Sequence, residues 1–343
     1  MNKLKAEIKE FGMKRALSIA FKVLLIIVCI IILFVIISVV RHKICSSKEK
    51  DLLAPLGELV EVNGHNMSVY TEGEGDKTLV FMSGGGTCSP ILDFKSLYSL
   101  LSSEYKIAVV EKFGYGFSDI VDEKRDIDTI LSETRMALDK AGIKGPYVLC
   151  PHSLSGLEAL YWAQKYPDEV EAIVGLDMAV PAYYDEMNIS IPMMKLGHYG
   201  AVLGITRWIP SLAESDTIKY GTLSEKEKEI YRAVFYQRTA TETMIDEAKV
   251  VKDNANIVKE NGIPQVPMLL FISNGSGGTG FTKEKWRSIP ENYISGHDNT
   301  SYIELDCPHY VHDYKYKEIS QEIRSFITVS YTHLRAHETV LDL

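Results

Sequence analysis

Short apolar runs and amphipathic stretches alternate along most of this chain. Each short run holds four to seven mostly aliphatic residues between polar or glycine-containing turns, a pattern that predicts buried β-strands. In the stretches between them, apolar positions recur with the period of a helix. This alternation predicts an α/β fold, a mostly parallel central sheet covered by helices on both faces. The predicted strands span residues 78–82, 106–111, 147–150, 171–176, 266–272 and 301–305, and the predicted helices 93–102, 127–141, 156–166 and 314–327.

Two stretches depart from this alternation. Residues 57–71 alternate polar and apolar positions around Asn63-Gly64, which predicts a hairpin at an antiparallel edge of the sheet. Residues 181–262 are helix-like and rich in Met and Tyr, and a capping box at 224–227 opens a helix over 228–239. This insertion follows the sixth strand, above the carboxyl ends of the strands, so we expect a helical cap over the site. A purely structural helical hairpin is the alternative.

The N-terminal region carries a long apolar segment. Residues 23–40 contain no charge, and the apolar character extends back to residue 16 across Lys22. A segment of this length can cross a bilayer, whereas a buried core helix is seldom apolar on every face. A cleavable signal peptide would have a shorter apolar region and a small-residue cleavage site. We therefore predict an uncleaved transmembrane anchor over 16–40, between a basic segment (1–15) and a linker (41–56).

Charge is unevenly spread over the 343 residues. Residues 1–50 hold ten Lys and Arg against three Glu, whereas the rest of the chain holds 27 Lys and Arg against 43 Asp and Glu. An acidic body of this kind argues against binding to nucleic acid. Five basic residues precede the apolar segment (residues 1–15) and four follow it (residues 41–50). This small excess before the segment favours a single-pass protein of the cell membrane with its N-terminus inside and its catalytic body extracellular.

The cysteines and the C-terminal tail add little chemistry. Five cysteines in a chain of this size do not indicate a disulfide framework. Cys-Pro-His occurs at 150–152 and again at 307–309, but the spacing is not that of a metal site, and we predict no metal or cofactor. Residues 329–339 read like the translation of a transposase-type sequencing adapter. We interpret 329–343 as a non-native tail and leave it out of the fold.

Ser153 is the most informative single residue. It follows the predicted strand 147–150 in the run Cys-Pro-His-Ser-Leu-Ser-Gly, and a helix begins directly after it. A serine at such a turn has its hydroxyl above the sheet and a helix N-terminus beneath it. The run resembles the nucleophile elbow of the α/β-hydrolase fold superfamily, with Pro151 and Ser155 in place of the usual glycines. An ordinary helix N-cap is the alternative interpretation.

The resemblance implies a histidine base, after the nucleophile in chain order. His309 matches best, since it follows the last predicted strand in a tight turn before the final helix. His152 precedes the serine, and we expect its side chain to point away from the turn. His312 is expected to pack or cap.

The resemblance implies an acid between nucleophile and base. The loop after the strand at 266–272 has no carboxylate, so Asp177, directly after the strand at 171–176, is the candidate. Haloalkane dehalogenases, among others, carry an acid at that position. A loop aspartate that caps the first cap helix is the alternative.

The run Ser83-Gly84-Gly85-Gly86 is similar to the oxyanion-loop motif of the superfamily, with serine in place of histidine. It implies that the backbone N–H groups of Gly85 and Leu154 bind an oxyanion. Residues 111–119 are similar to a turn that shapes the site in the same superfamily. The resemblance covers about residues 59–327, which implies a hydrolase core over 57–180 and 263–328 and a cap over 181–262.

Taken together, the resemblance implies a membrane-anchored serine hydrolase that cleaves a carboxylic ester of a small or lipid-like substrate. A serine nucleophile argues against dehalogenation, which uses a carboxylate. A proline iminopeptidase-like amide hydrolase is an alternative on the same fold. Two further readings stay open: a catalytically inactive binding protein, and a protein that remodels lipid at the bilayer. The sequence does not indicate an oligomeric state.

Overall fold

A computed structural model describes the backbone of residues 2–341 and the side chains of residues 9–328. Its centre is an eight-stranded sheet in the order β1-β2-β4-β3-β5-β6-β7-β8. Strands β1 and β2 form an antiparallel hairpin, β2 pairs antiparallel with β4, and the remaining neighbours are parallel. The predicted fold class is confirmed. The strands are β1 Glu58–Val62, β2 His65–Glu72, β3 Thr78–Met82, β4 Lys106–Glu111, β5 Tyr147–Pro151, β6 Val170–Leu176, β7 Met268–Ile272 and β8 Thr300–Glu304.

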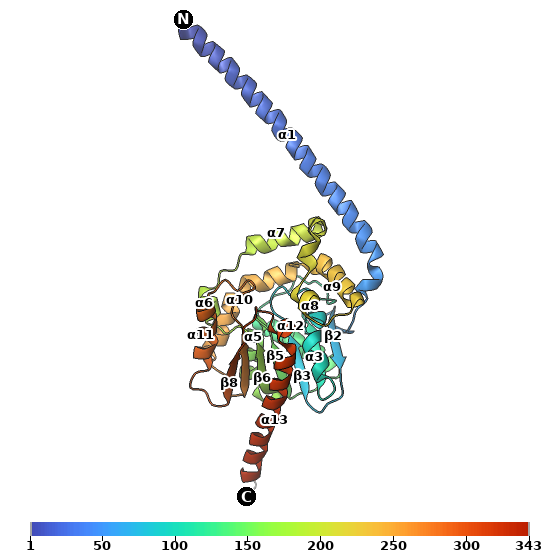
Figure 1. The fold of residues 1–343 in the computed structure, drawn as a ribbon, viewed down its shortest axis with the longest axis vertical. Helices are drawn as coiled ribbons and strands as arrows, with labels where there is room; N and C mark the ends of the chain where they lie inside the picture. Colours follow the sequence, from blue (N-terminus) through green and yellow to red (C-terminus); the bar gives the residue numbers. More distant parts are fainter. Residues whose placement is uncertain (1, 342–343) are drawn as a thin grey trace.

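Helices cover both faces of the sheet (Figure 1). Alternate residues of β3 show why: Val80 and Met82 belong to one buried cluster, Leu79 and Phe81 to the other. In the first cluster, one face of the sheet packs against α4, α5 and α11. In the second, the opposite face packs against α2, α3 and α13. These helices are α2 Pro90–Asp93, α3 Lys95–Leu101, α4 Ile127–Lys140, α5 Ser155–Lys165, α11 Lys283–Ile294 and, after the short α12 Val311–Tyr314, α13 Tyr316–Leu341.

Local signals in the sequence correspond to observed turns and caps. Asn63 and Gly64 both have positive φ, as a two-residue hairpin between β1 and β2 requires. Ser224 and Glu227 form the capping box that opens α9, Glu225–Arg238. Helix α11 was not predicted, because Pro290 inside it is a helix-breaking signal in sequence.

The insertion between β6 and β7 is helical and lies over one end of the sheet, on the side from which α1 leaves the body (Figure 1). Helix α10 packs against α5 of the core and against α7. The elements of the insertion are α6 Tyr183–Glu186, α7 Ile191–Val202, η3 Ile205–Trp208, η4 Pro210–Ala213, α8 Asp216–Tyr220, α9 and α10 Glu242–Glu260.

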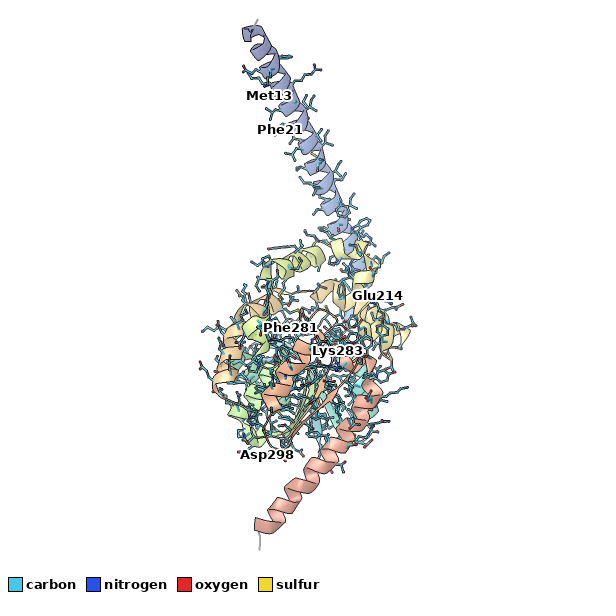
Figure 2. The ribbon with its side chains drawn as sticks, turned by 60° about the vertical axis from the view of Figure 1, so that its left-hand side comes forward. Met13, Phe21, Glu214, Phe281, Lys283 and Asp298 are labelled. Carbon is cyan, nitrogen blue, oxygen red and sulfur yellow. The ribbon has the colours of Figure 1, made fainter. Side chains whose placement is uncertain are left out.

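The N-terminal apolar segment is part of one long helix, α1 Asn2–Lys48. Among the described residues it is the one helix long and apolar enough to cross a membrane, and almost none of its apolar stretch is buried. Met13 and Phe21 project from it far from the body (Figure 2). The helix does not end near residue 40 but continues to Lys48, through part of the expected linker, and η1 Lys50–Leu53 follows.

The last residues of the chain continue α13 as far as Leu341. The side chains of residues 329–343, the segment interpreted as a non-native tail, lie outside the described part of the chain. That interpretation therefore stays a prediction.

Candidate active site

Ser153 lies in a strained turn between β5 and α5. Its φ is +52°, a left-handed conformation that residues with a side chain rarely adopt. The turn is held from both sides: the carbonyl oxygen of Ser153 accepts N–H bonds from Gly156 (2.9 Å) and Ala179 (2.7 Å). This is the strand–turn–helix geometry of a nucleophile elbow, with the side chain only partly buried.

The residues that replace the motif glycines fit their surroundings. The hydroxyl of Ser155 is buried and donates to the carbonyl oxygens of Met82 (2.7 Å) and His152 (2.9 Å). Glycine is required one position later, because a Cβ on Gly156 would lie 2.2 Å from the carbonyl oxygen of Ala179. The helix thus approaches the loop after β6 closely, although the glycine pattern of the motif is not kept.

Asp177 and His309 come together at the carboxyl ends of β6 and β8. The Asp177 Oδ2 atom lies 2.5 Å from Nδ1 of His309. The other carboxylate oxygen, Oδ1, accepts the backbone N–H of Ser273 (2.7 Å) and the indole N–H of Trp286 (2.9 Å). With donors on both oxygens the carboxylate is fixed, and Nδ1 of the imidazole carries the proton that it donates. His309 Nε2 is then left as a proton acceptor.

The ring of His309 is held by its neighbours. Its backbone N–H donates to the carbonyl oxygen of Ser276 (2.9 Å), in the loop after β7. Trp286 meets the imidazole edge to face, with ring centres 5.4 Å apart. The side chain keeps 11% exposure, against 1% for Asp177. The base is therefore oriented on one side and open on the other.

His152 does not point away from the site as expected, but packs against the base. Its ring centre lies 4.7 Å from that of His309, and its Nε2–H donates to the His309 carbonyl oxygen (3.3 Å). Burial, together with the neighbouring His309 and His312, holds the pKa of His152 well below its usual value. His312 packs against Phe94, and burial lowers its pKa to about 3. Both rings are neutral supports of the loop.

The glycine-rich loop after β3 lies against the turn at Ser153. A Cβ on Gly84 would lie 2.8 Å from the Cβ of Ser153, and one on Gly85 would lie 3.2 Å from Cδ1 of Leu154. Within the described residues the backbone N–H groups of Gly85 and Leu154 have no acceptor. Two unpaired N–H donors thus lie on the two segments that meet beside the serine.

Within residues 9–328 the Ser153 hydroxyl makes no hydrogen bond. Ser153 and His309 thus both lie beyond the carboxyl ends of parallel strands, without a hydrogen bond between them. Such bonds are often long or poorly aligned before substrate binds.

A second buried polar cluster lies next to the site and was not found from the sequence. Lys112, directly after β4, contacts Glu158 of α5 and Glu247 of α10, each at 2.5 Å. The hydroxyl of Tyr115 donates to Glu247 (2.5 Å) and accepts the N–H of Gly86 (3.4 Å). The cluster thereby links the cap, the helix after Ser153 and the glycine loop. The signal available in the sequence was Glu158, a charged residue among the apolar positions of the predicted helix 156–166.

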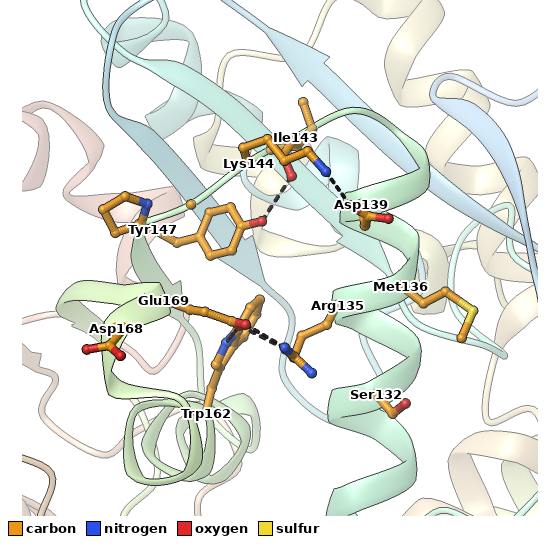
Figure 3. Close-up of a pocket in the computed structure, with 12 residues that line it drawn as sticks. Ser132, Arg135, Met136, Asp139, Ile143, Lys144, Tyr147, Trp162, Asp168 and Glu169 are labelled. Atoms are coloured by element: carbon orange, nitrogen blue, oxygen red, sulfur yellow. Dashed lines mark hydrogen bonds and ion pairs between the residues drawn. The ribbon is translucent and has the colours of Figure 1, made fainter.

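One surface hollow lies away from this site. It has a volume of about 550 Å³ and lies between α4 and α5, beside the ion pair of Arg135 with Glu169 and the indole of Trp162 (Figure 3). Tyr147, at its rim, is the first residue of β5, whereas Ser153 follows the last. Ligands of parallel sheets bind at the carboxyl ends of the strands, which is the opposite end.

Comparison with known proteins shows the family and the fold of the chain. No family model matches the chain. The uncharacterized protein YbdG of Bacillus subtilis is 40% identical over 258 residues, which cover 73% of this chain and 79% of YbdG. The chain belongs to the YbdG family.

Solved structures similar to this chain show its fold. An enol-lactonase from Burkholderia xenovorans superposes with a TM-score of 0.59 at 15% identity, over 79% of this chain and all of the lactonase. A Bacillus megaterium epoxide hydrolase gives the same TM-score at 16% identity, with the same coverage of both chains. Together with the sheet order, these likenesses show that the chain has the α/β-hydrolase fold.

Proposed function

We propose that this protein is a serine hydrolase that cleaves a carboxylic ester through an acyl-enzyme. The observation that carries the proposal is the 2.5 Å contact between Asp177 Oδ2 and His309 Nδ1, at the same edge of the sheet as Ser153. Fold alone would not support an activity, because many functions share it. An oriented acid–base pair beside a strained serine and two unpaired N–H groups is the arrangement that nucleophilic acyl transfer uses.

In the proposed reaction Ser153 Oγ attacks the acyl carbon while His309 Nε2 takes the hydroxyl proton. Asp177 holds the imidazole by its Nδ1–H and stabilises the imidazolium that forms. The N–H groups of Gly85 and Leu154 donate to the oxygen that becomes negative. Collapse of this intermediate breaks the ester bond, and the alcohol leaves with the proton from His309.

Water completes the cycle. His309 takes a proton from a water molecule whose oxygen attacks the acyl-Ser153 carbon, and the same N–H groups stabilise the second oxyanion. The acyl–oxygen bond to the serine then breaks, the proton returns to Ser153 Oγ, and the carboxylic acid is released. Every proton transfer passes through His309 Nε2, the one ring nitrogen not engaged by Asp177.

We further propose that α1 is a membrane anchor, with the N-terminus inside the cell and residues 46–328 outside. The length and composition of the helix, and the exposure of its apolar side chains, support an anchor. A signal sequence would be removed, so the mass of the mature protein distinguishes the two. Protease added to intact cells should digest the body, whereas complete protection would reverse the orientation.

Labelling with a fluorophosphonate probe tests the nucleophile. The full-length protein in detergent should be labelled, and Ser153→Ala should lose the label while its melting temperature stays close to that of the parent. Ser155→Ala is the matched control, because Ser155 lies in the same turn but bonds to backbone carbonyls. Retained labelling of Ser153→Ala, with loss in Ser155→Ala, would refute the assignment.

Substrate panels test the ester class. Hydrolysis of p-nitrophenyl esters without hydrolysis of aminoacyl anilides would support an esterase. Preference for the anilides would favour the amide hydrolase, which the same residues could serve. A folded protein that neither reacts with the probe nor hydrolyses any substrate would favour the inactive binding protein.

A further inference from the structure

One side of the helical insertion exposes apolar side chains in an ordered row. On α7 they recur every third residue, so they form an exposed stripe that winds around roughly half of the helix. Helix α7 alone runs for about 18 Å at 1.5 Å per residue. The members, here called the cap face, are 50 to 66% exposed: Met193, Leu196, Tyr199 and Val202 on α7, and Ile209 and Leu212 after it.

The charge of this segment differs from that of the rest of the body. Residues 188–213 contain no Asp or Glu, and their two charged residues, Lys195 and Arg207, are basic. The body as a whole is strongly acidic. Scattered apolar residues on a surface need no explanation, but a contiguous, acid-free apolar face indicates a binding surface.

The cap face is continuous with the apolar part of α1. Trp208, between its two halves, donates its indole N–H to Ser38 Oγ (3.1 Å) and packs against Phe34 at 5.5 Å between ring centres. Both partners lie within the uncharged segment 23–40. Figure 1 shows α7 at the end of the body from which α1 leaves.

The junction between α1 and the cap is tightly built. Arg207 is buried and bonds through its two terminal nitrogens to the carboxylate of Glu49 (2.7 and 2.6 Å) and through Nε to His42 Nδ1 (2.9 Å). A Cβ on Gly204 would lie 2.4 Å from the Cβ of His42, so the two backbones approach closely. The cap face is therefore held at a fixed level relative to residue 38.

We propose that the cap face lies in the interfacial layer of the bilayer that α1 spans. This inference rests on the proposed membrane anchoring, not on the proposed chemistry. If residues 23–40 fill the hydrocarbon, Ser38 is near its boundary, and Trp208 is at the same depth. Tryptophan and tyrosine favour this layer, and an apolar helix face beside basic residues binds there. A protein partner would have to occupy the space that the lipid already fills.

Quenching by brominated lipid tests the proposal. In a Trp208→Phe background the two remaining tryptophans, Trp162 and Trp286, are buried. A new tryptophan is then placed by Leu196→Trp on the cap face or, as the matched control, by Tyr302→Trp on β8. Tyr302 is also apolar and exposed but lies outside the face. Each full-length variant is reconstituted into phosphatidylcholine vesicles with brominated or unbrominated acyl chains.

The proposal predicts quenching for Leu196→Trp and none for Tyr302→Trp. Quenching should be strongest when the bromines lie near the headgroups, because interfacial helices lie roughly 5–10 Å deep. Flotation with the vesicles is measured on the same samples. A chain that does not float overturns both this inference and the anchor. If the chain floats but the emission of Leu196→Trp is the same in brominated and unbrominated vesicles, as for Tyr302→Trp, this inference alone is overturned.

Discussion

Two buried polar clusters lie side by side in this protein, and they differ in their exposure to solvent. In the first, Asp177 contacts His309 at 2.5 Å, and His309 keeps 11% exposure. In the second, Lys112 contacts Glu158 and Glu247 at 2.5 Å, and each of the three side chains is about 5% exposed or less. The partner distances are the same, but only the first cluster has an open side.

The comparison shows how the site proposed for chemistry differs from a structural one. The first cluster ends on His309 Nε2, an acceptor with no charged partner, so a proton can be taken up there. In the second, burial alone would lower the pKa of Lys112, but its two carboxylate partners outweigh burial and raise it. That lysine stays charged, and its partners tie α5 and α10 to the strand end. We infer that one cluster serves chemistry and the other holds the cap.

Asp177→Asn should break the first cluster with the largest effect. The amide cannot balance the charge of an imidazolium or impose the same tautomer, and we expect turnover to fall by about 10⁴-fold. The free energy of unfolding should change much less, because the side-chain oxygen can still accept the N–H groups of Ser273 and Trp286. Ester hydrolysis and denaturant unfolding, measured on the same preparation, check both. Near-normal turnover would show that another acid serves His309.

Lys112→Met should break the second cluster. It leaves two buried carboxylates without their cation, and we expect the free energy of unfolding to fall by about 3–5 kcal/mol. Lys283→Met is the matched control, because its ion pair with Asp306 is exposed and contributes roughly 0–1 kcal/mol. Urea unfolding of the two variants measures the difference. An equal loss of unfolding free energy in the two variants would show that the buried lysine cluster stabilises the fold no more than an exposed ion pair does.

Glu111 sharpens the comparison, because it is a buried carboxylate that accepts N–H bonds but contacts no cation among residues 9–328. It accepts the N–H of Phe117 (2.8 Å), and burial raises its pKa to about 7. The folded state therefore binds more protons than the unfolded state between about pH 4.5 and 7. Its contribution to the free energy of unfolding falls as pH rises through that window, by roughly 3 kcal/mol.

Glu111→Gln removes this titration. Urea unfolding at pH 5 and pH 8 should show a smaller loss of stability with rising pH in the variant than in the parent. Parallel behaviour of the two proteins would show that Glu111 titrates alike in the folded and unfolded states.

Much of the fold followed from local patterns. The six predicted strands lie within two residues of the observed ones at either end. Five of them are buried and need continuous apolar runs, whereas β8, expected to be buried, is an exposed edge strand. The candidate acid and base were found by their places after strands, and the structure brings them together. Trp286 and Ser273, the donors to Asp177, were not found. Trp286 lies on α11, which Pro290 obscured, and a backbone N–H leaves no mark in sequence.

The sequence by itself determined the strands, most helices of the core, the apolar N-terminal segment and the residue types available for chemistry, because each depends on neighbours a few positions away. Only the tertiary structure decided which polar residues meet. Asp177 and His309 are 132 positions apart, and Lys112 and Glu247 are 135 apart. Contacts over such separations depend on the order of strands in the sheet and on the packing of the cap. Neither is contained in local periodicity, so neither the support around Asp177 nor the lysine cluster could be read from the sequence alone.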